Sequence, residues 1–401
     1  MVLYRVILGL LLPVLLLIRL LRGETWADLG QRLGLAPRGM GDQRLWLHGA
    51  SNGEVTSARW LIEDLLAARP GLQILITSNT RTARQMVRDW ALPGVVAALA
   101  PVDLQWPTQR LLTRWQPVAL ISLEAELWPN RFAACAGRGL PVLLIGARMS
   151  PRSFRRWQWL PAFPTRALGF VRFASAQDDG SRRHLAALGL GTLGADFDLK
   201  AASVARLPAP DLPPRERRAG WLLAASTHDG EEAMVLDAFA AQTQFRQLIL
   251  APRHPARAAA VAALLTARKV TFNRRSTGAM PGEATVFLAD SMGEMDQWYR
   301  HAGACIIGGS FADKGGHTPW EPSRFACALL HGPSTWNFGA LFTALDAAGA
   351  AFPVTADSLA PALSTMTAAA QDRMALRAKA ILQSKGDETG LLTQILTHSR
   401  L

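Results

Sequence analysis

The sequence predicts an α/β protein made of two Rossmann-like domains, each with a parallel sheet, preceded by an apolar N-terminal segment. Three observations support this fold class. Short apolar runs alternate with segments of helical spacing in both halves of the 401-residue chain, which is the pattern of βαβ units. Residues 205–218 interrupt the alternation with four prolines and mixed charge, as expected of a linker. Residues 6–21 are almost wholly apolar.

The buried-strand pattern recurs four times in each half. The predicted strands are residues 45–48, 72–77, 118–123 and 142–146, then 221–225, 247–252, 285–288 and 304–307. Segments such as 55–69 and 82–90 carry helical spacing. The predicted domains are an N-terminal anchor at 1–23, a first Rossmann-like domain at 24–204, a linker at 205–218 and a second Rossmann-like domain at 219–401. Ligands would bind outside the carboxyl ends of the strands, in a cleft between the two domains.

The N-terminal apolar run predicts a membrane anchor that is not cleaved. Residues 6–21 are interrupted by Pro13 and Arg19, and the run is shorter than the roughly 20 residues of a spanning helix. Arg19 and Arg22 follow the run where a signal peptide would have small residues. With Arg5 they flank it as for a segment held on the cytoplasmic face. We expect a monotopic or shallowly inserted anchor; a buried first helix is the alternative.

Composition narrows the partners and the compartment. The formal charge of +12 favours anionic partners such as nucleic acid, phospholipid headgroups or phosphorylated lipids, although it can also serve solubility alone. The three cysteines form no C-x-x-C pair, which argues against a disulfide framework and a cysteine zinc site. A reducing, cytoplasmic compartment fits, and no metal-ligand spacing is visible.

The first chemical motif follows the first predicted strand. Gly49 and Gly53 allow a tight turn, and Glu54 lies at the start of the next helix. A carboxylate there is stabilised by the helix N-terminus and suits a general base. A helix-capping glutamate is the alternative interpretation.

The same residues also spell the G-x-S-x-G pattern of a hydrolase nucleophile elbow, with Ser51 at its centre. Ser51 could then act with His228, His254 or His317. Two points count against this hypothesis. An elbow on the first strand leaves no earlier loop to provide the second oxyanion donor, and the later motifs stay unexplained.

Further motifs follow successive predicted strands. In the first half, residues 123–130 place Glu124 and Glu126 at a strand end, and residues 146–150 contain Arg148. The second half holds motifs at residues 225–232, 252–257, 291–295, 308–310 and 315–322. Backbone N–H groups at helix starts, together with Arg253 and Arg257, predict a phosphate cradle.

In their order and spacing these motifs resemble those of the Kdo transferases, which attach 3-deoxy-manno-octulosonic acid (Kdo) to the lipid A precursor. The resemblance runs nearly end to end and implies the GT-B glycosyltransferase fold. It implies that Glu54 is the catalytic base and that Glu124 is a second carboxylate that helps to position substrate. The donor-binding residues implied are Ser226, Arg253, His254, Met292, Gly293, Glu294, Gly316, His317 and Glu321. Ser51, Gly53 and Arg148 match acceptor-side or structural positions.

The resemblance also implies a reaction and its partners. The donor would be CMP-Kdo, the acceptor a lipid A precursor, and the location the cytoplasmic face of the inner membrane, with membrane lipid as a partner and no nucleic acid. One direct displacement would invert the anomeric centre. Because the leaving group is a nucleoside monophosphate, arginine and helix dipoles can replace a metal, so no cofactor is expected.

Five residues depart from the family's pattern. Asn52 stands where valine is usual, and Gly146 and Thr318 stand where asparagine is usual. Trp320 replaces a smaller aliphatic residue, and Asp196 lies near the position of a usual lysine. A paralogue with changed sugar or acceptor specificity is therefore an alternative to the Kdo transferase itself.

Overall fold

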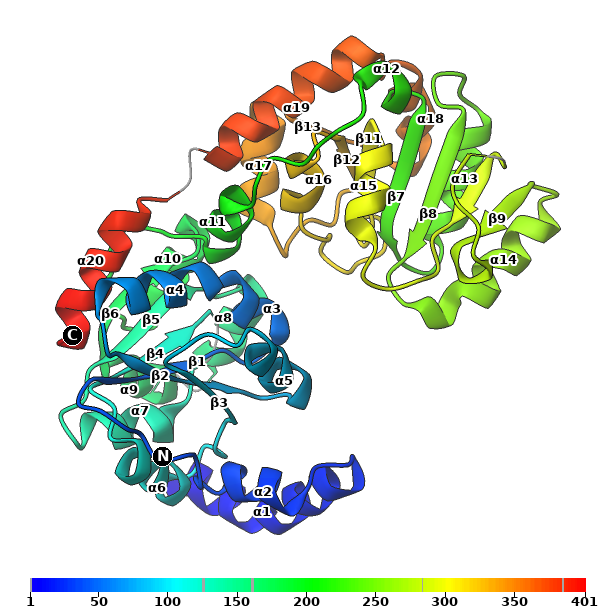
Figure 1. The fold of residues 1–401 in the computed structure, drawn as a ribbon. Coiled ribbons are helices and arrows are strands. Elements are labelled where there is room, and N and C mark those ends of the chain that lie inside the picture. The colour runs from blue at the N-terminus through cyan, green and yellow to red at the C-terminus, as the bar shows by residue number, and fades with distance from the viewer. Residues whose placement is uncertain (1, 125–126, 160–161, 283, 384–385) are drawn as a thin grey trace. The chain divides into compact units, whose positions relative to one another are not determined.

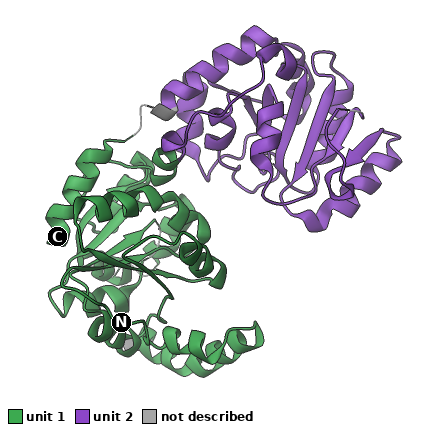
Figure 2. Cartoon of the chain, viewed as in Figure 1, with its two compact units in different colours: residues 1–203, 386–401 green, residues 204–385 purple. Residues whose placement is uncertain are grey.

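The computed structural model describes the chain except for residues 1, 125–126, 160–161, 283 and 384–385. The chain divides into two compact units (Figure 2): Met1–Ser203 with Gly386–Leu401, and Val204–Lys385. The predicted second domain ended at residue 401, and here the structure differs. The C-terminal helix α20 (Glu388–Ser399) buries Leu391 and Ile395 in the core of the first unit, so it belongs there.

The first unit is a six-stranded parallel sheet with helices on both faces (Figure 1). Its strands are β1 (Arg44–His48), β2 (Gln73–Ser78), β3 (Val95–Leu99), β4 (Ala119–Leu123), β5 (Val142–Ala147) and β6 (Val171–Ala176). Its other helices are α1 (Val2–Leu21), α2 (Trp26–Arg32), α3 (Asn52–Ser57), α4 (Arg59–Ala68), α5 (Arg81–Asp89), α6 (Gln105–Trp115), α7 (Pro129–Ala136), α8 (Pro151–Gln158), α9 (Ala162–Leu168) and α10 (Asp179–Ala187). Helix α11 (Leu199–Arg206) runs into the second unit.

Strand order places a topological switch in the middle of this sheet. The order is β3-β2-β1-β4-β5-β6. After β1 the chain adds strands toward one edge of the sheet, and after β4 it adds strands toward the opposite edge. Successive residues point to opposite faces: Leu45 and Leu47 belong to one core, and Trp46 to the other. The loops after β1 and β4 therefore diverge, and open parallel sheets bind ligands at this point.

The second unit is a seven-stranded parallel sheet of order β13-β12-β11-β7-β8-β10-β9. Its strands are β7 (Trp221–Thr227), β8 (Gln247–Pro252), β9 (Phe272–Arg274), β10 (Val286–Leu288), β11 (Ala304–Ile307), β12 (Ala328–His331) and β13 (Ala351–Pro353). Its helices are α12 (Arg215–Arg218), α13 (Glu231–Ala240), η1 (Pro255–Arg257), α14 (Ala258–Ala267), η2 (Arg275–Thr277), α15 (Met295–His301), α16 (Trp320–Arg324), α17 (Gly339–Ala347), α18 (Ala356–Ser364) and α19 (Ala368–Gln383). The switch lies between β7 and β11.

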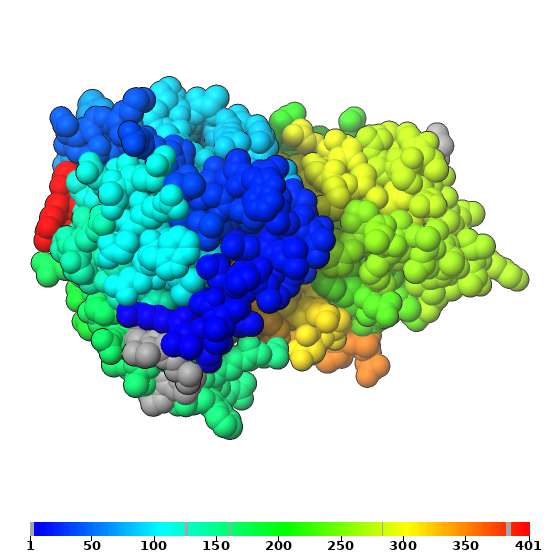
Figure 3. Space-filling model, turned by 90° about the horizontal axis from the view of Figure 1, so that it is seen from below, coloured from blue at the N-terminus to red at the C-terminus, as the bar shows by residue number. Residues whose placement is uncertain are grey.

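Helix α1 lies on the surface of the first unit (Figure 3). One face, spaced every three or four residues, is half-buried and includes Tyr4, Arg5, Leu8, Leu12, Leu15 and Arg19. The apolar side chains of the other face are 40–79% exposed: Val6, Ile7, Leu10, Leu11, Val14, Leu17, Ile18 and Leu21. The helix is thus attached to the unit without forming part of its core.

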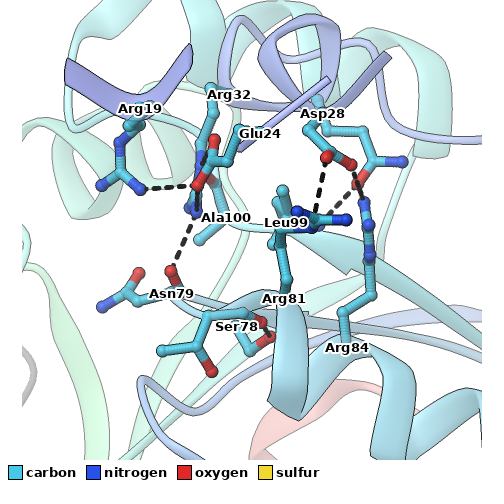
Figure 4. A network of polar contacts seen from close by, with 12 residues as sticks. Arg19, Glu24, Asp28, Arg32, Ser78, Asn79, Arg81, Arg84, Leu99 and Ala100 are labelled. Atoms are coloured by element: carbon cyan, nitrogen blue, oxygen red, sulfur yellow. Dashed lines mark hydrogen bonds and ion pairs between the residues drawn. The ribbon is translucent and has the colours of Figure 1, made fainter. Parts of the chain in front are cut away.

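Ion pairs and hydrogen bonds connect the end of α1 to α2, and α2 to the rest of the first unit (Figure 4). Glu24 accepts hydrogen bonds from Arg19 and from the buried Arg32, which also donates to the carbonyls of Asn79 and Ala100. Nearby, the buried Asp28 pairs with Arg84 at 2.6 Å. Asp28 and Arg32 thus hold α2 on the unit, and Glu24 joins the end of α1 to α2.

Candidate active site

The turn after β1 holds the Glu54 carboxylate in a defined orientation. Ser51 is the N-cap of α3, and its hydroxyl accepts from the Glu54 N–H at 3.3 Å. The Glu54 carboxylate in turn accepts from the Ala50 N–H at 2.7 Å and from the Ser51 hydroxyl at 3.1 Å. Glu54 remains partly exposed. Ser51 caps the helix, and the Glu54 carboxylate is bonded back to the turn before it, which keeps it at the strand end.

Topology brings the predicted second carboxylate to the neighbouring strand end. Glu124 follows β4, which pairs with β1 in parallel, and its N–H donates to the Ile145 carbonyl at 3.0 Å. Its φ of 50° is a left-handed conformation that an ordinary side chain seldom adopts. Glu126, the other carboxylate of this motif, lies outside the described residues. Glu54 and Glu124 thus flank the topological switch of the first unit.

Close packing at Gly49 joins the two strand ends. A Cβ atom on Gly49 would lie 2.8 Å from the Val55 side chain and 3.2 Å from that of Leu123, the last residue of β4. The glycine is therefore needed for close approach of the β1 turn to β4.

Three departures in the first unit have structural explanations. Gly146 has a φ of 63°, a region that glycine and asparagine both tolerate. The Asn52 amide oxygen accepts from the hydroxyls of Thr80 and Thr82, tying α3 to the start of α5. Asp196 forms an ion pair with Arg182 at 2.7 Å. The remaining predicted residues here, Gly53 and Arg148, lie in the first turn of α3 and just after β5.

The predicted donor-binding residues of the second unit follow the carboxyl ends of β7, β8, β10 and β11. Ser226 near the end of β7 has a φ of 57°. A Cβ atom on Gly308 would lie 2.3 Å from the Ser226 carbonyl, so only glycine fits where the β11 turn meets β7.

Three histidines from separate segments meet at this edge. His228 and His317 stack with nearly parallel rings, and their Nε2 atoms lie 3.0 Å apart. His254 meets His228 edge-on at 6.1 Å between ring centroids. Burial lowers the pKa of His228, and His254, Lys314 and Arg253 add to this, while Glu231 opposes it. The two Nε2 atoms are thus within hydrogen-bonding distance, and both cationic side chains and the Glu231 carboxylate act on the His228 ring.

Glu231 organises this edge, a role that the sequence motif did not reveal. The side chain is 3% exposed. One carboxylate oxygen accepts from the N–H groups of His228 and Gly309, both at 2.8 Å. The other accepts from those of Phe311 at 3.0 Å and Ala312 at 3.2 Å. A single buried carboxylate therefore joins the turn after β7 to the turn after β11.

Arg257, which the sequence paired with Arg253 as a phosphate cradle, has another partner. Its guanidinium forms a forked pair with the buried Glu232, including a contact of 3.1 Å, and also contacts Asp229 at 2.9 Å. Arg253 is exposed and follows β8, and its backbone N–H donates a hydrogen bond to the Thr227 carbonyl. Of the two arginines, Arg253 is the one whose side chain faces solvent at the strand ends.

Glu294 also has a partner that sequence spacing did not show. Arg275 donates to both carboxylate oxygens, with a shortest contact of 2.7 Å, and the Ser291 hydroxyl donates as well. The Arg275 contacts, followed by that of Ser291, hold the pKa of Glu294 below its usual range. In the same turn Met292 is exposed and Gly293 has a φ of 83°.

The last motif forms the start of α16. Glu321 lies in its first turn, and Gly316 has a φ of 71°. Both departures of this motif lie here: the Thr318 hydroxyl accepts from the N–H of Trp320, and the Trp320 side chain is buried. Within the described part of the chain, no group of three His, Cys, Asp or Glu side chains could hold a metal ion.

Comparisons of sequence with known proteins point to one family. Residues 27–201 match the sequence model of the 3-deoxy-D-manno-octulosonic-acid transferase (kdotransferase) family. The chain is 32% identical to the 3-deoxy-D-manno-octulosonic acid transferase of Haemophilus influenzae, over 82% of this chain and 81% of that protein. It is 34% identical to the Bordetella pertussis enzyme of the same name, over 77% and 75%. MurG of Acinetobacter baumannii shares the fold at 12% identity, with a TM-score of 0.53 over 89% of this chain and all of that one.

Proposed function

The chain belongs to the Kdo transferase family of GT-B glycosyltransferases, and we propose that it moves Kdo from CMP-Kdo to a lipid A precursor with inversion at the anomeric carbon. The observation that carries the proposal is the pair of carboxylates, Glu54 and Glu124, at the adjacent ends of β1 and β4. They flank the switch point at which an open parallel sheet binds its ligand.

Glu54 acts as the general base in this proposal. Its carboxylate takes the proton from the attacking acceptor hydroxyl while that oxygen bonds to the anomeric carbon. The bond from the anomeric carbon to the phosphate oxygen breaks in the same step, and CMP leaves with the electron pair. Hydrogen bonds from Ala50 and Ser51 hold the carboxylate in place, and Glu124 positions the acceptor.

The second unit binds the donor. Arg253, His254 and His317 supply positive charge or N–H donors for the single phosphate, and Glu321 accepts hydrogen bonds from the ribose hydroxyls. Ser226, Met292, Gly293, Glu294 and Gly316 shape the surrounding turns. Arg253, His254 and His317 stabilise the negative charge that develops on the phosphate of the leaving CMP. The transfer therefore proceeds without a metal ion.

Transfer by the purified protein tests the function directly. Incubation with CMP-Kdo and a lipid A precursor should give a product heavier by one or more Kdo residues in the mass spectrum. The rate should be the same in the presence of a chelator. A product that forms from a UDP-sugar but not from CMP-Kdo would instead indicate a paralogue with another donor.

We further propose that α1 is a monotopic anchor on the cytoplasmic face of the inner membrane. By length and composition α1 could cross a membrane. However, Tyr4 contacts Asp103, and Arg19 contacts Glu24, which is itself bonded to the buried Arg32. Tyr4 and Arg19 lie about 22 Å apart along a helix that rises 1.5 Å per residue. A helix held at both ends on one domain lies in the membrane plane and inserts its outer apolar face.

Charges on that outer face should release the protein from membranes. The double variant Leu10→Asp/Leu17→Asp alters side chains that are 76% and 56% exposed, so the unit should still fold. An acidic residue within a bilayer costs up to roughly 3 kcal/mol, so the membrane-bound fraction should fall at least about tenfold. Flotation with vesicles measures this fraction, and Leu376→Asp, at a 68% exposed position of α19, is the matched control. A double variant that stays bound, or loses its cooperative melting, would contradict the monotopic assignment.

A further inference from the structure

The first turn of α1 is hydrogen-bonded to the segment that carries the acceptor-side motif. The Tyr4 hydroxyl donates to Asp103 at 3.0 Å, and the Arg5 guanidinium donates to the Asn130 side-chain oxygen at 2.7 Å. Asp103 is 2% exposed and Asn130 is fully buried. These contacts link positions 99 and 125 residues apart, so they are tertiary contacts of the folded unit.

Asp103 anchors the start of helix α7. Its carboxylate accepts from the N–H groups of Asn130 at 3.3 Å and Arg131 at 2.8 Å, and its carbonyl accepts from the Asn130 amide at 2.7 Å. Burial raises the pKa of Asp103, while Arg131 and the backbone donors act in the opposite direction. Asp103 thus binds the first turn of α7 from one side, and Tyr4 binds Asp103 from the other.

Helix α7 directly follows the motif that contains Glu124. Trp128 is the N-cap residue of α7. Trp128 also contacts the buried Arg131, whose guanidinium lies 5.0 Å from the centre of its ring. Tyr4, Asp103 and Trp128 line one cavity of about 240 Å³ beneath α1. Glu124, directly after β4, is held by the hydrogen bond from its N–H to the Ile145 carbonyl of β5.

We propose that Tyr4 and Arg5 are positioning residues that hold the start of α7, which begins at Pro129, in its active arrangement. Helix α1 then completes the acceptor site in addition to binding the membrane. The inference rests on the proposed function, because it assigns Glu124 and the residues before α7 to the acceptor side. Misplacement of a positioning group by about 1 Å can lower a rate by about 100-fold.

Arg5→Ala, Arg5→Lys and Tyr4→Phe test the inference in the full-length protein. With acceptor dispersed in detergent micelles, membrane binding does not limit turnover. Arg5→Ala should lower kcat at least about tenfold, Arg5→Lys should restore part of it, and Tyr4→Phe should have a smaller effect. The CMP-induced rise in melting temperature, which reports on the second unit, should not change. Arg22→Ala, an exposed arginine just past the same helix, is the control for charge.

Hydrogen exchange of residues 127–136 separates this inference from the function. Arg5→Ala should speed exchange there while leaving the amides of β1 and β2 protected. If the wild type transfers Kdo and Arg5→Ala keeps normal kcat and exchange, the positioning role is wrong and the function stands. If the wild type transfers no Kdo, the function is wrong, and exchange alone decides whether α1 holds α7. A kcat loss matched by Arg22→Ala would also overturn the inference.

Discussion

Replacing Glu54 by Gln should lower kcat by about 100-fold or more, with little effect on CMP binding. The amide is nearly isosteric with the carboxylate. Its oxygen can still accept the Ala50 N–H, and its NH₂ group can donate to the Ser51 hydroxyl, so the turn after β1 should persist. An amide cannot take the proton of the attacking hydroxyl, however. Single-turnover kinetics with CMP-Kdo and a lipid A precursor measure the effect.

Two further variants make this result specific. Glu63→Gln, at an exposed position on α4, is the matched control and should keep normal turnover. Ser51→Ala removes an N-cap hydroxyl and should cost about 1 kcal/mol of stability while much of the transfer persists. If Glu54→Gln keeps near-normal kcat, another group is the base. If Ser51→Ala abolishes activity at unchanged stability, the nucleophile hypothesis returns.

The strands that the sequence predicted all lie inside the two sheets rather than at their edges. All eight predicted runs correspond to β1, β2, β4, β5, β7, β8, β10 and β11 within one or two residues at each end. Most of the strands missed are sheet edges: β3, β6, β9 and β13. An edge strand has one neighbour and less burial, as in β9 and β13, so its residues need not form a continuous apolar run.

The C-terminal helix could not be assigned to a unit from its sequence. Leu391 and Ile395 give α20 an apolar face, but such a face packs equally well on either sheet. A division at the proline-rich linker assumes that each unit is one continuous segment. The chain returns to the first unit at Gly386, so this unit consists of two separate segments.

Sequence motifs located the carboxylates of the candidate site but not their partners. The functional side chains follow strand ends, and parallel topology gathers strand ends at one edge. The partners lie in segments far away along the chain. Arg275, directly after β9, contacts Glu294, and Tyr4 of α1 contacts Asp103. Spacing along the chain carries no information about such contacts. The same limit applies to the predicted phosphate ligand Arg257, whose pairing with Glu232 its spacing does not reveal.

Replacing Glu231 by Gln should destabilise the second unit and abolish most CMP binding. The two carboxylate oxygens accept four backbone N–H groups, from His228, Gly309, Phe311 and Ala312. In glutamine one oxygen becomes an NH₂ group, which would face two N–H donors and leave them without an acceptor inside the protein. The loss of hydrogen bonds to a charged group, together with the buried donors left unpaired, should lower the free energy of unfolding by about 3 kcal/mol.

Thermal melting with and without CMP, in the presence of a chelator, separates stability from binding. CMP at about 100 times its Kd should stabilise the wild type by about 2.7 kcal/mol and raise its melting temperature. Glu231→Gln should melt lower and gain little from CMP, since His228 and the turn after β11 lose their shared acceptor. Arg253→Ala should melt normally without CMP, because this side chain is exposed, yet gain less from the ligand. Glu216→Gln, at an exposed position on α12, should match the wild type in both measurements. Unchanged melting and CMP response in Glu231→Gln would show that the turns after β7 and β11 hold their geometry without this carboxylate.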